Sequence, residues 1–153
     1  MAETTHDSFT IERRYPHSAA KLFAAISSPV LKPRWFAVGR HASDFTIDFS
    51  VGGREHQIFV MGDDTPFPGT IIENDGRYED IVPGERIVHS GTMTFGGKRI
   101  STALTTYEVA SDGDGATLRL THQAVFYEGS DGPEMRKHGW TVLVDNLPAV
   151  LDA

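Results

Sequence analysis

Apolar residues recur at three- and four-residue steps over one long stretch of the chain, residues 132–153. This spacing predicts an amphipathic helix, and at 1.5 Å per residue the helix is ~30 Å long. Its apolar face is formed by Met135, Trp140, Leu143, Val144, Leu147, Val150 and Leu151. Asp131 is expected to cap the N-terminus, with Glu134 completing a capping box. Pro148 predicts a kink or a restart, because proline lacks a backbone donor.

Most of the remaining chain alternates apolar and polar residues with a period of two, which predicts half-buried β-strands. The predicted strands are residues 8–15, 44–51, 54–61, 77–82, 86–95, 98–109 and 116–127, with a short strand at 70–72. Glycine- and proline-containing turns separate most of them, at 52–53, 83–84, 96–97 and 112–115. Turns this short favour antiparallel hairpins.

Two short helices are predicted between the first two strands. Ser18 is expected to cap the first helix, and Ser28 and Pro29 are expected to begin the second, which runs through Leu31. The apolar face of the first helix consists of Ala19, Leu22, Phe23 and Ile26.

This order of elements predicts an α+β fold in which a strongly bent antiparallel sheet of six to seven strands wraps around the long C-terminal helix. A helix that lies across a bent sheet leaves a cavity wherever the two do not fill the space between them. Residues 1–153 show no internal repeat and no low-complexity segment. We therefore expect one domain.

Composition and charge exclude several classes of function. The chain contains no cysteine, which excludes disulfides and thiol nucleophiles and is typical of a reducing cytoplasm. The net charge is −7 and no basic cluster is present, which argues against binding to nucleic acids or anionic membranes. The start, MAETTHDS, does not resemble a secretory signal, and no apolar run approaches the ~18 residues of a membrane span. We expect a cytoplasmic protein, with a homodimer as one expected assembly.

Several motifs together resemble a known family. They are residues 9–16, 18–25, 28–29, 34–35, 48–53 (DFSVGG), 76–83 (GRYEDIVP), 85–88 (ERIV), 115–121 and 139–147. In this order the chain resembles the START-like, or helix-grip, superfamily, and most of all the bacterial proteins named after the C-terminal domain of the activator of the Hsp90 ATPase. The resemblance implies the helix-grip fold and an internal, mostly apolar cavity. It implies no reaction, because proteins of one fold carry out many functions.

His122 is the strongest candidate for a residue that contacts ligand or acts in catalysis. In residues 116–127 it shares a phase with Leu118, Leu120, Ala124 and Phe126, so its ring is expected to point towards the helix. Relatives more often carry an acidic residue at this place, which makes His122 a departure from the family pattern. It is either a hydrogen-bonded core histidine or a residue that contacts ligand and acts as a general base.

The other candidate ligand-binding residues lie on strands or near helix ends. They are Trp35, Phe36, His56, Tyr78, His89, Tyr107 and Trp140. His89 shares a phase with Met93 and Phe95 and is expected to point inward, and His56, which shares a phase with Ile58 and Val60, is a further candidate for an inward orientation. Glu79 and Asp80 are adjacent, so at most one of them can enter the cavity. At least one of these two acids is expected on the surface. A structural role in the core is preferred for His56, His89 and Tyr107, whereas the large aromatic residues Trp35, Phe36 and Trp140 are either core or ligand contacts.

Three functions follow, in order of preference. The first is binding of a small apolar or aromatic molecule between helix and sheet. The second is a cofactor-free cyclase, dehydratase or hydrolase with His122 as base. The third is a chaperone-interaction module, which would require a large exposed apolar patch. No Ser-His-Asp elbow, phosphate-binding glycine loop or metal-ligand spacing is present, so we expect neither a metal nor a cofactor.

Overall fold

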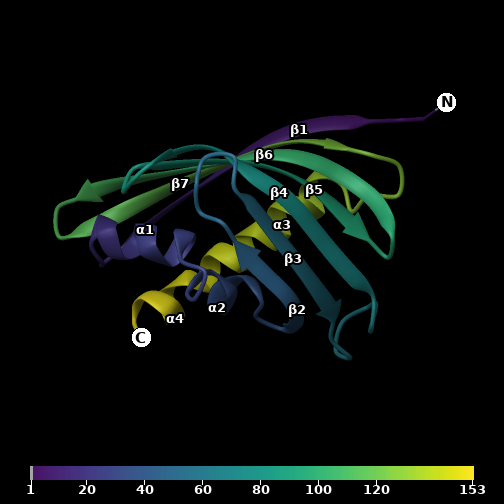
Figure 1. Ribbon diagram of the computed structural model, residues 1–153, viewed down its shortest axis with the longest axis horizontal. Helices are drawn as coiled ribbons and strands as arrows, with labels where there is room; N and C mark the ends of the chain where they lie inside the picture. The colour runs from purple at the N-terminus through teal and green to yellow at the C-terminus, as the bar shows by residue number, and fades with distance from the viewer. Residues whose placement is uncertain (1) are drawn as a thin grey trace.

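The computed structural model describes residues 2–153. They form a seven-stranded, fully antiparallel sheet that bends around the C-terminal helices (Figure 1). The strands are β1 (Thr5–Tyr15), β2 (Arg40–Ile47), β3 (Arg54–Met61), β4 (Ile71–Val82), β5 (Arg86–Phe95), β6 (Lys98–Asp112) and β7 (Gly115–Phe126). Their order across the sheet is β1-β7-β6-β5-β4-β3-β2. This confirms the predicted α+β helix-grip fold.

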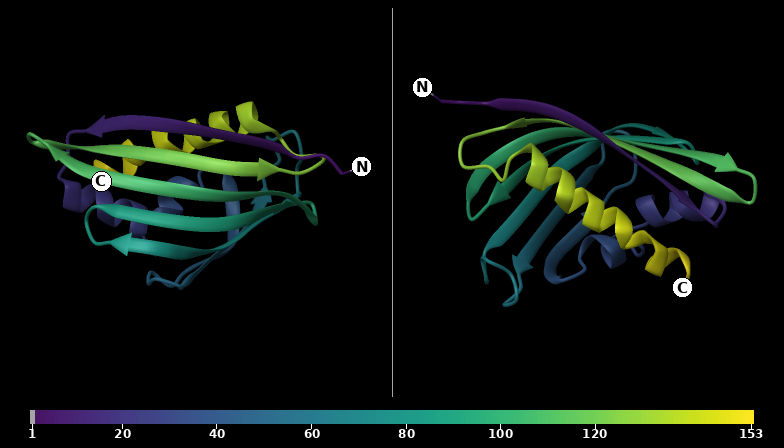
Figure 2. Two further views of the ribbon diagram at one scale, coloured as in Figure 1. Left: turned by 90° about the horizontal axis from the view of Figure 1, so that it is seen from above. Right: turned by 180° about the vertical axis from the view of Figure 1, so that it is seen from behind.

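Four helices accompany the sheet: α1 (Ala19–Ser27), α2 (Lys32–Phe36), α3 (Pro133–Asp145) and α4 (Leu147–Leu151). Figure 2 shows α3 lying across the concave face of the sheet, with α1 and α2 near its C-terminal end. No helix among residues 2–153 is long and apolar enough to cross a membrane.

The two short helices agree only in part with the sequence prediction. Ser18 caps α1 as expected, because its hydroxyl accepts a hydrogen bond from the Lys21 amide at 3.1 Å. The predicted start of the second helix at Ser28 and Pro29 is wrong. The hydroxyl of Ser28 instead accepts from the amides of the next turn, and α2 begins at Lys32 with Pro33 in its first turn.

The C-terminal helix is interrupted near Pro148, as predicted. α3 ends at Asp145, and α4 begins at Leu147 with the proline in its first turn, where a missing donor costs nothing. The predicted capping box is wrong. Gly132 occupies the N-cap with a φ of 86° and no side-chain cap forms there, because the Asp131 carboxylate pairs with Arg136.

Four strands differ in extent from the prediction by more than one residue: β1 begins three residues earlier, β6 ends three residues later, and β2 and β4 differ more. β2 begins and ends earlier than residues 44–51, and residues 48–53 form the connection to β3 in place of a two-residue turn. β4 is continuous where two separate strands were predicted, and it passes through Gly76. Pairing with β3 and β5 on both sides satisfies the backbone there, so local sequence preference does not decide where the strand ends.

The main core lies between the concave face of the sheet and the helices, with buried residues from α1, α2 and α4 and Val144 from α3. Leu147 and Leu151 of α4 are buried in the same cluster as Leu118 and Leu120 of β7. Trp140 and Leu143 pack against this cluster but are only partly buried. Along α3 the contact between helix and sheet therefore opens, and the cavity begins at this point.

Candidate ligand-binding cavity

A cavity of about 670 Å³ lies between the concave face of the sheet and helices α2 and α3. Strands β3 to β7 contribute its floor, and Phe36, Trp140 and Leu143 contribute its helical side. Val38, Phe67, Met135 and Val142 line it and are also exposed to solvent, so they mark its opening. The volume is in the range of typical small-molecule sites.

The register of the strands explains why space remains. Side chains of the inner face form rows that run across the strands, and one of these rows carries almost no side chains. It consists of Ala124, Ala103, Gly91 and Gly76, which are direct cross-strand partners. Ala103 and Gly91 line the cavity. The row is the physical origin of the cavity, because methyl groups and hydrogens leave the space above the sheet unfilled.

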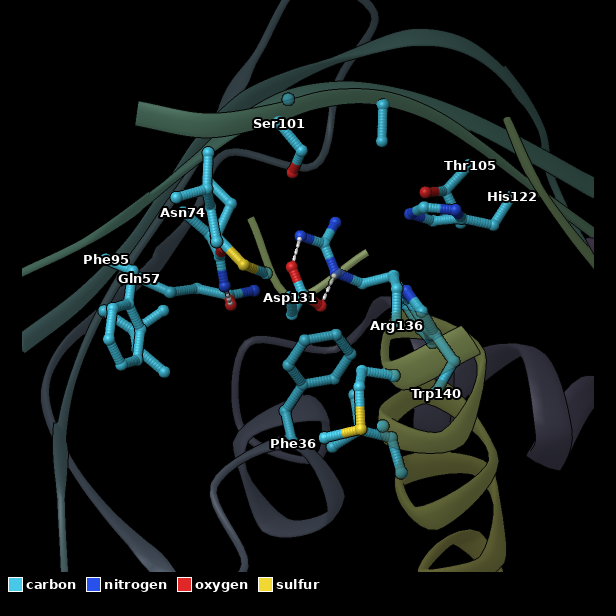
Figure 3. Close-up of a pocket in the computed structure, with 18 of the residues that line it drawn as sticks. Phe36, Gln57, Asn74, Phe95, Ser101, Thr105, His122, Asp131, Arg136 and Trp140 are labelled. Carbon is cyan, nitrogen blue, oxygen red and sulfur yellow. Dashed lines mark hydrogen bonds and ion pairs between the residues drawn. The ribbon is translucent and has the colours of Figure 1, made fainter. Parts of the chain in front are cut away.

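Polar side chains flank this small-residue row on both sides. On one side His122, Thr105, His89 and Tyr78 are cross-strand partners from β7 to β4. On the other side Ser101 is linked through Met93 to Asn74 and Gln57. Figure 3 shows Thr105 and His122 on one side of the cavity and Gln57 and Asn74 on the opposite side.

His122 points into the cavity and is only 2% exposed. Its ring stacks on Phe9 at a centroid distance of 4.9 Å and lies 6.0 Å from Trp140. Burial lowers the pKa of His122 to about 4, and the charge of Arg136 acts in the same direction. The imidazole is therefore neutral at pH 7. Its Nδ1 is buried and finds no hydrogen-bond partner among the described residues.

A buried ion pair shapes the wall at β3. Lys32 of α2 is 2% exposed and donates to both carboxylate oxygens of Glu55, which is 4% exposed, at 2.8 and 3.1 Å. Burial alone would raise the pKa of Glu55, but Lys32 holds it below its ordinary value. The carboxylate also accepts hydrogen bonds from Gln57 and from the Tyr78 hydroxyl. The acid is thus ionised and fully paired.

His89 lies beside this carboxylate without bonding to it. Its Nε2 is 3.9 Å from Glu55 Oε2 and has no partner among residues 2–153. Burial lowers the pKa of His89 to about 4, against an opposing effect of Glu55. A Cβ atom at Gly76 would meet the His89 ring at 2.6 Å. The ring therefore occupies the β4 end of the small-residue row.

A second ion pair stands at the N-terminal end of α3. Arg136 is buried, and its Nε and Nη2 donate to the two carboxylate oxygens of Asp131 at 3.0 and 2.9 Å. The guanidinium also lies 5.1 Å from the ring centroid of Phe126. Ser101, which is 1% exposed and has an unpartnered hydroxyl within the described chain, faces the same end of the cavity (Figure 3).

The structure divides the eight residues proposed from sequence into three groups: those that line the cavity, those buried beside it, and His56 on the outer face of the sheet. Five of them line the cavity: Phe36, His89, Tyr107, His122 and Trp140. Trp35 and Tyr78 are fully buried beside it, where the Trp35 indole donates to the Ala25 carbonyl and the Tyr78 hydroxyl to Glu55. These two residues support the wall rather than form it.

The expectation that His56 points inward is wrong. Its Nδ1 and Nε2 each lie 2.6 Å from a carboxylate, of Asp44 and of Glu73, on the outer face of the sheet. The hydrogen bond with Glu73, reinforced by Asp44, raises the pKa of His56. The inner phase of β3 belongs to Glu55, Gln57 and Phe59.

Neither Glu79 nor Asp80 enters the cavity. Glu79 accepts from Arg77 and Ser90, and Asp80 from Arg86, all among exposed side chains. A bulge in the β4–β5 pairing between Tyr78 and Asp80 keeps the two acids out of the inner face.

Sequence reasoning missed the polar groups that matter most: Glu55, Gln57, Asn74, Ser101 and Arg136. Ser101 had a readable signal, because it shares a phase with Ala103, Thr105 and Tyr107. Glu55 had none in its own strand, since only Lys32, 23 residues away, makes its burial tolerable. Among residues 2–153, no group of three or more acidic or histidine side chains is arranged to hold a metal ion.

Comparison with known proteins identifies a family for this chain. The family model described as "Activator of Hsp90 ATPase homolog 1-like protein" matches residues 16–152. A comparison with curated proteins found no match.

Solved structures resemble the chain over nearly its whole length. An uncharacterised protein from Rhizobium leguminosarum has a TM-score of 0.90 and 33% identity, covering 99% of this chain and 98% of its own. Protein Mll3558 from Rhizobium loti has a TM-score of 0.86 and 36% identity, covering 97% and 99%. CalU16 from Micromonospora echinospora shares the fold, with a TM-score of 0.63 and 18% identity over 99% and 85% of the two chains. By the family match and these relatives, the chain belongs to the Activator of Hsp90 ATPase homolog 1-like family.

Proposed function

We propose that this protein binds a small, mostly apolar molecule in the cavity between α3 and the sheet, in the cytoplasm. The observation that carries the proposal is an apolar cavity of about 670 Å³ whose wall contains buried polar atoms without hydrogen-bond partners among residues 2–153. An unpaired buried polar group costs free energy, and a ligand that pairs with it recovers that cost. Exposed apolar side chains at the opening give such a molecule a path of entry.

Binding is favoured over general-base catalysis at His122. A general base works best with a pKa near the operating pH and with a partner that orients its ring. His122 has a pKa of about 4, and its Nδ1 has no such partner among the described residues. The neutral ring can instead donate or accept one hydrogen bond and so orient a ligand.

The proposal is tested with 1-aminoanthracene, an apolar fluorescent probe. Saturable binding with one probe per chain is expected, together with a change in tryptophan fluorescence, because Trp140 lines the cavity. A hundredfold excess over the dissociation constant should stabilise the native state by about 2.7 kcal/mol.

Two leucine substitutions on β6 form a matched pair for this test. Ala103→Leu fills the small-residue row and should abolish binding of the probe, whereas Thr106→Leu, in the opposite phase of the same strand, should leave it unchanged. Equal binding by both variants would show that the probe sits elsewhere, and absence of binding to the wild-type chain would refute the proposal.

A further inference from the structure

The two rows of polar side chains that flank the small-residue row constrain the shape of the ligand as well as its polarity. On β6, Thr105 and Ser101 stand on either side of Ala103, and all three side chains line the cavity. Thr105 is the cross-strand partner of His122. Polar groups therefore stand at both ends of an apolar floor.

The unsatisfied polar atoms lie in both rows. Ser101 is 1% exposed and its hydroxyl has no partner among residues 2–153, and the same holds for Nδ1 of His122, which is 2% exposed. Buried polar atoms in native proteins are nearly always paired. Their presence on opposite sides of one cavity indicates that a bound molecule brings polar atoms to both sides.

The spacing of the two rows sets the length of that molecule. Ser101 and Thr105 are four residue steps apart along β6, a separation of ~13.6 Å at about 3.4 Å per residue. Hydrogen bonds of ~2.8 Å at each end leave about 8 Å between the two polar atoms of the ligand. Hydroxyl oxygens at opposite corners of a two-ring aromatic, as in 2,6-dihydroxynaphthalene, are spaced to match.

The side chains around the space between the two polar rows favour a flat ligand. Ala103 and Gly91 form the floor, and Phe36 and Trp140 line the helical side with aromatic rings. Flat apolar surfaces suit a flat ring system, because aromatic rings stack or meet edge to face at close range. The ring of His89, which lies over Gly76, closes the floor on the β4 side.

We propose that the ligand is a flat aromatic molecule of two fused rings with a hydroxyl or keto oxygen at each end. Its body lies along β6 over Ala103, one oxygen reaches Ser101, and the other reaches Thr105 and His122. This inference rests on the proposed binding function and adds to it the shape and the polar pattern of the ligand.

Three probes of the same shape test the pattern by calorimetry: naphthalene, 2-naphthol and 2,6-dihydroxynaphthalene. Each added hydroxyl should tighten binding about fivefold to tenfold, since it pairs with a group that is otherwise unsatisfied. Ser101→Ala should reduce the affinity for the diol to that for 2-naphthol while leaving naphthalene binding unchanged. Thr106→Ala removes a hydroxyl from the opposite phase of the same strand and should change none of the three affinities.

The outcomes separate this inference from the proposed function. Naphthalene and the diol binding within twofold of one another would overturn the two-ended pattern and leave apolar binding intact. Ser101→Ala weakening all three probes equally would overturn the assigned role of Ser101. Failure of all three to bind the wild-type chain would overturn both proposals.

Discussion

Lys32 and Glu55 form a pair of opposite charges that is almost completely removed from water. Such a pair is held by mutual attraction and by further hydrogen bonds, here from Gln57 and Tyr78 to the carboxylate. Breaking it costs far more than forming it gains, because the remaining charge stays buried without a partner. The pair fixes α2 to β3 and so fixes one side of the cavity.

Lys32→Met should therefore destabilise the protein by about 3–5 kcal/mol, because Glu55 is left unpaired. The double variant Lys32→Met/Glu55→Leu should recover much of this loss, since no buried charge remains. Urea denaturation of both variants measures the difference. A loss below about 1 kcal/mol in the single variant would mean that Glu55 reaches water or takes up a proton without strain.

His122 links stability to pH. Its pKa in the folded protein, about 4, lies below the ~6.5 of an unperturbed histidine. As pH falls, the unfolded chain binds the proton first, so the stability that is present above pH ~6.5 is progressively lost down to about pH 4. The two pKa values imply a loss on the order of 2–3 kcal/mol at the low end.

His122→Phe should reduce this acid sensitivity, and NMR titration of the ring should place its pKa well below 6. The comparison is made between pH 6.5 and 4.5, where the variant is expected to lose less stability than the wild-type chain. An NMR pKa near 6.5 would show that the ring is in contact with solvent.

At the residue scale, the sequence predicted side-chain orientation best in strands where one of the two phases is clearly apolar. Leu118, Leu120 and Ala124 identify the inner phase of β7, so His122 could be oriented correctly. β3 has no such phase, because its inner residues include Glu55 and Gln57 while Ile58 and Val60 lie on the other side. The distant charge of Lys32 decides the orientation, and alternation along one strand cannot show it.

At the scale of elements, α3 and α4 share one long amphipathic stretch of sequence, but their apolar residues lie in different surroundings. α4 buries Leu147 and Leu151 in the main core, whereas Leu143 and Trp140 of α3 are partly buried and face the cavity. Periodicity predicted this apolar face, and Pro148 predicted the restart. Neither could show that half of the face lines a cavity, because an apolar residue has the same pattern against a filled or an open space.

Leu147→Ala should cost about 2–5 kcal/mol, the usual range for a fully buried leucine. Val142→Ala, an exposed position on α3, should cost less than about 0.5 kcal/mol. Chemical denaturation checks both. Similar losses for the two variants would contradict the assignment of α4 to the core and of Val142 to the cavity opening.

At the scale of the whole molecule, the bent sheet and the helix across it create a concave surface that the small-residue row keeps open. The fold could be predicted from the order of elements and from the family resemblance. The row could not, because Ala124, Ala103 and Gly91 come from three strands and meet only through cross-strand register. The cavity is therefore a property of the register and not of any single strand.

The central claim is that a small apolar molecule binds above this row, and NMR of a complex with naphthalene tests it most directly. Intermolecular nuclear Overhauser effects are expected from naphthalene protons to the methyl groups of Ala103, Met93 and Leu143, all of which line the cavity. Effects confined to exposed residues outside it, such as Val30 and Val51, or the absence of any effect at saturating naphthalene, would contradict the account.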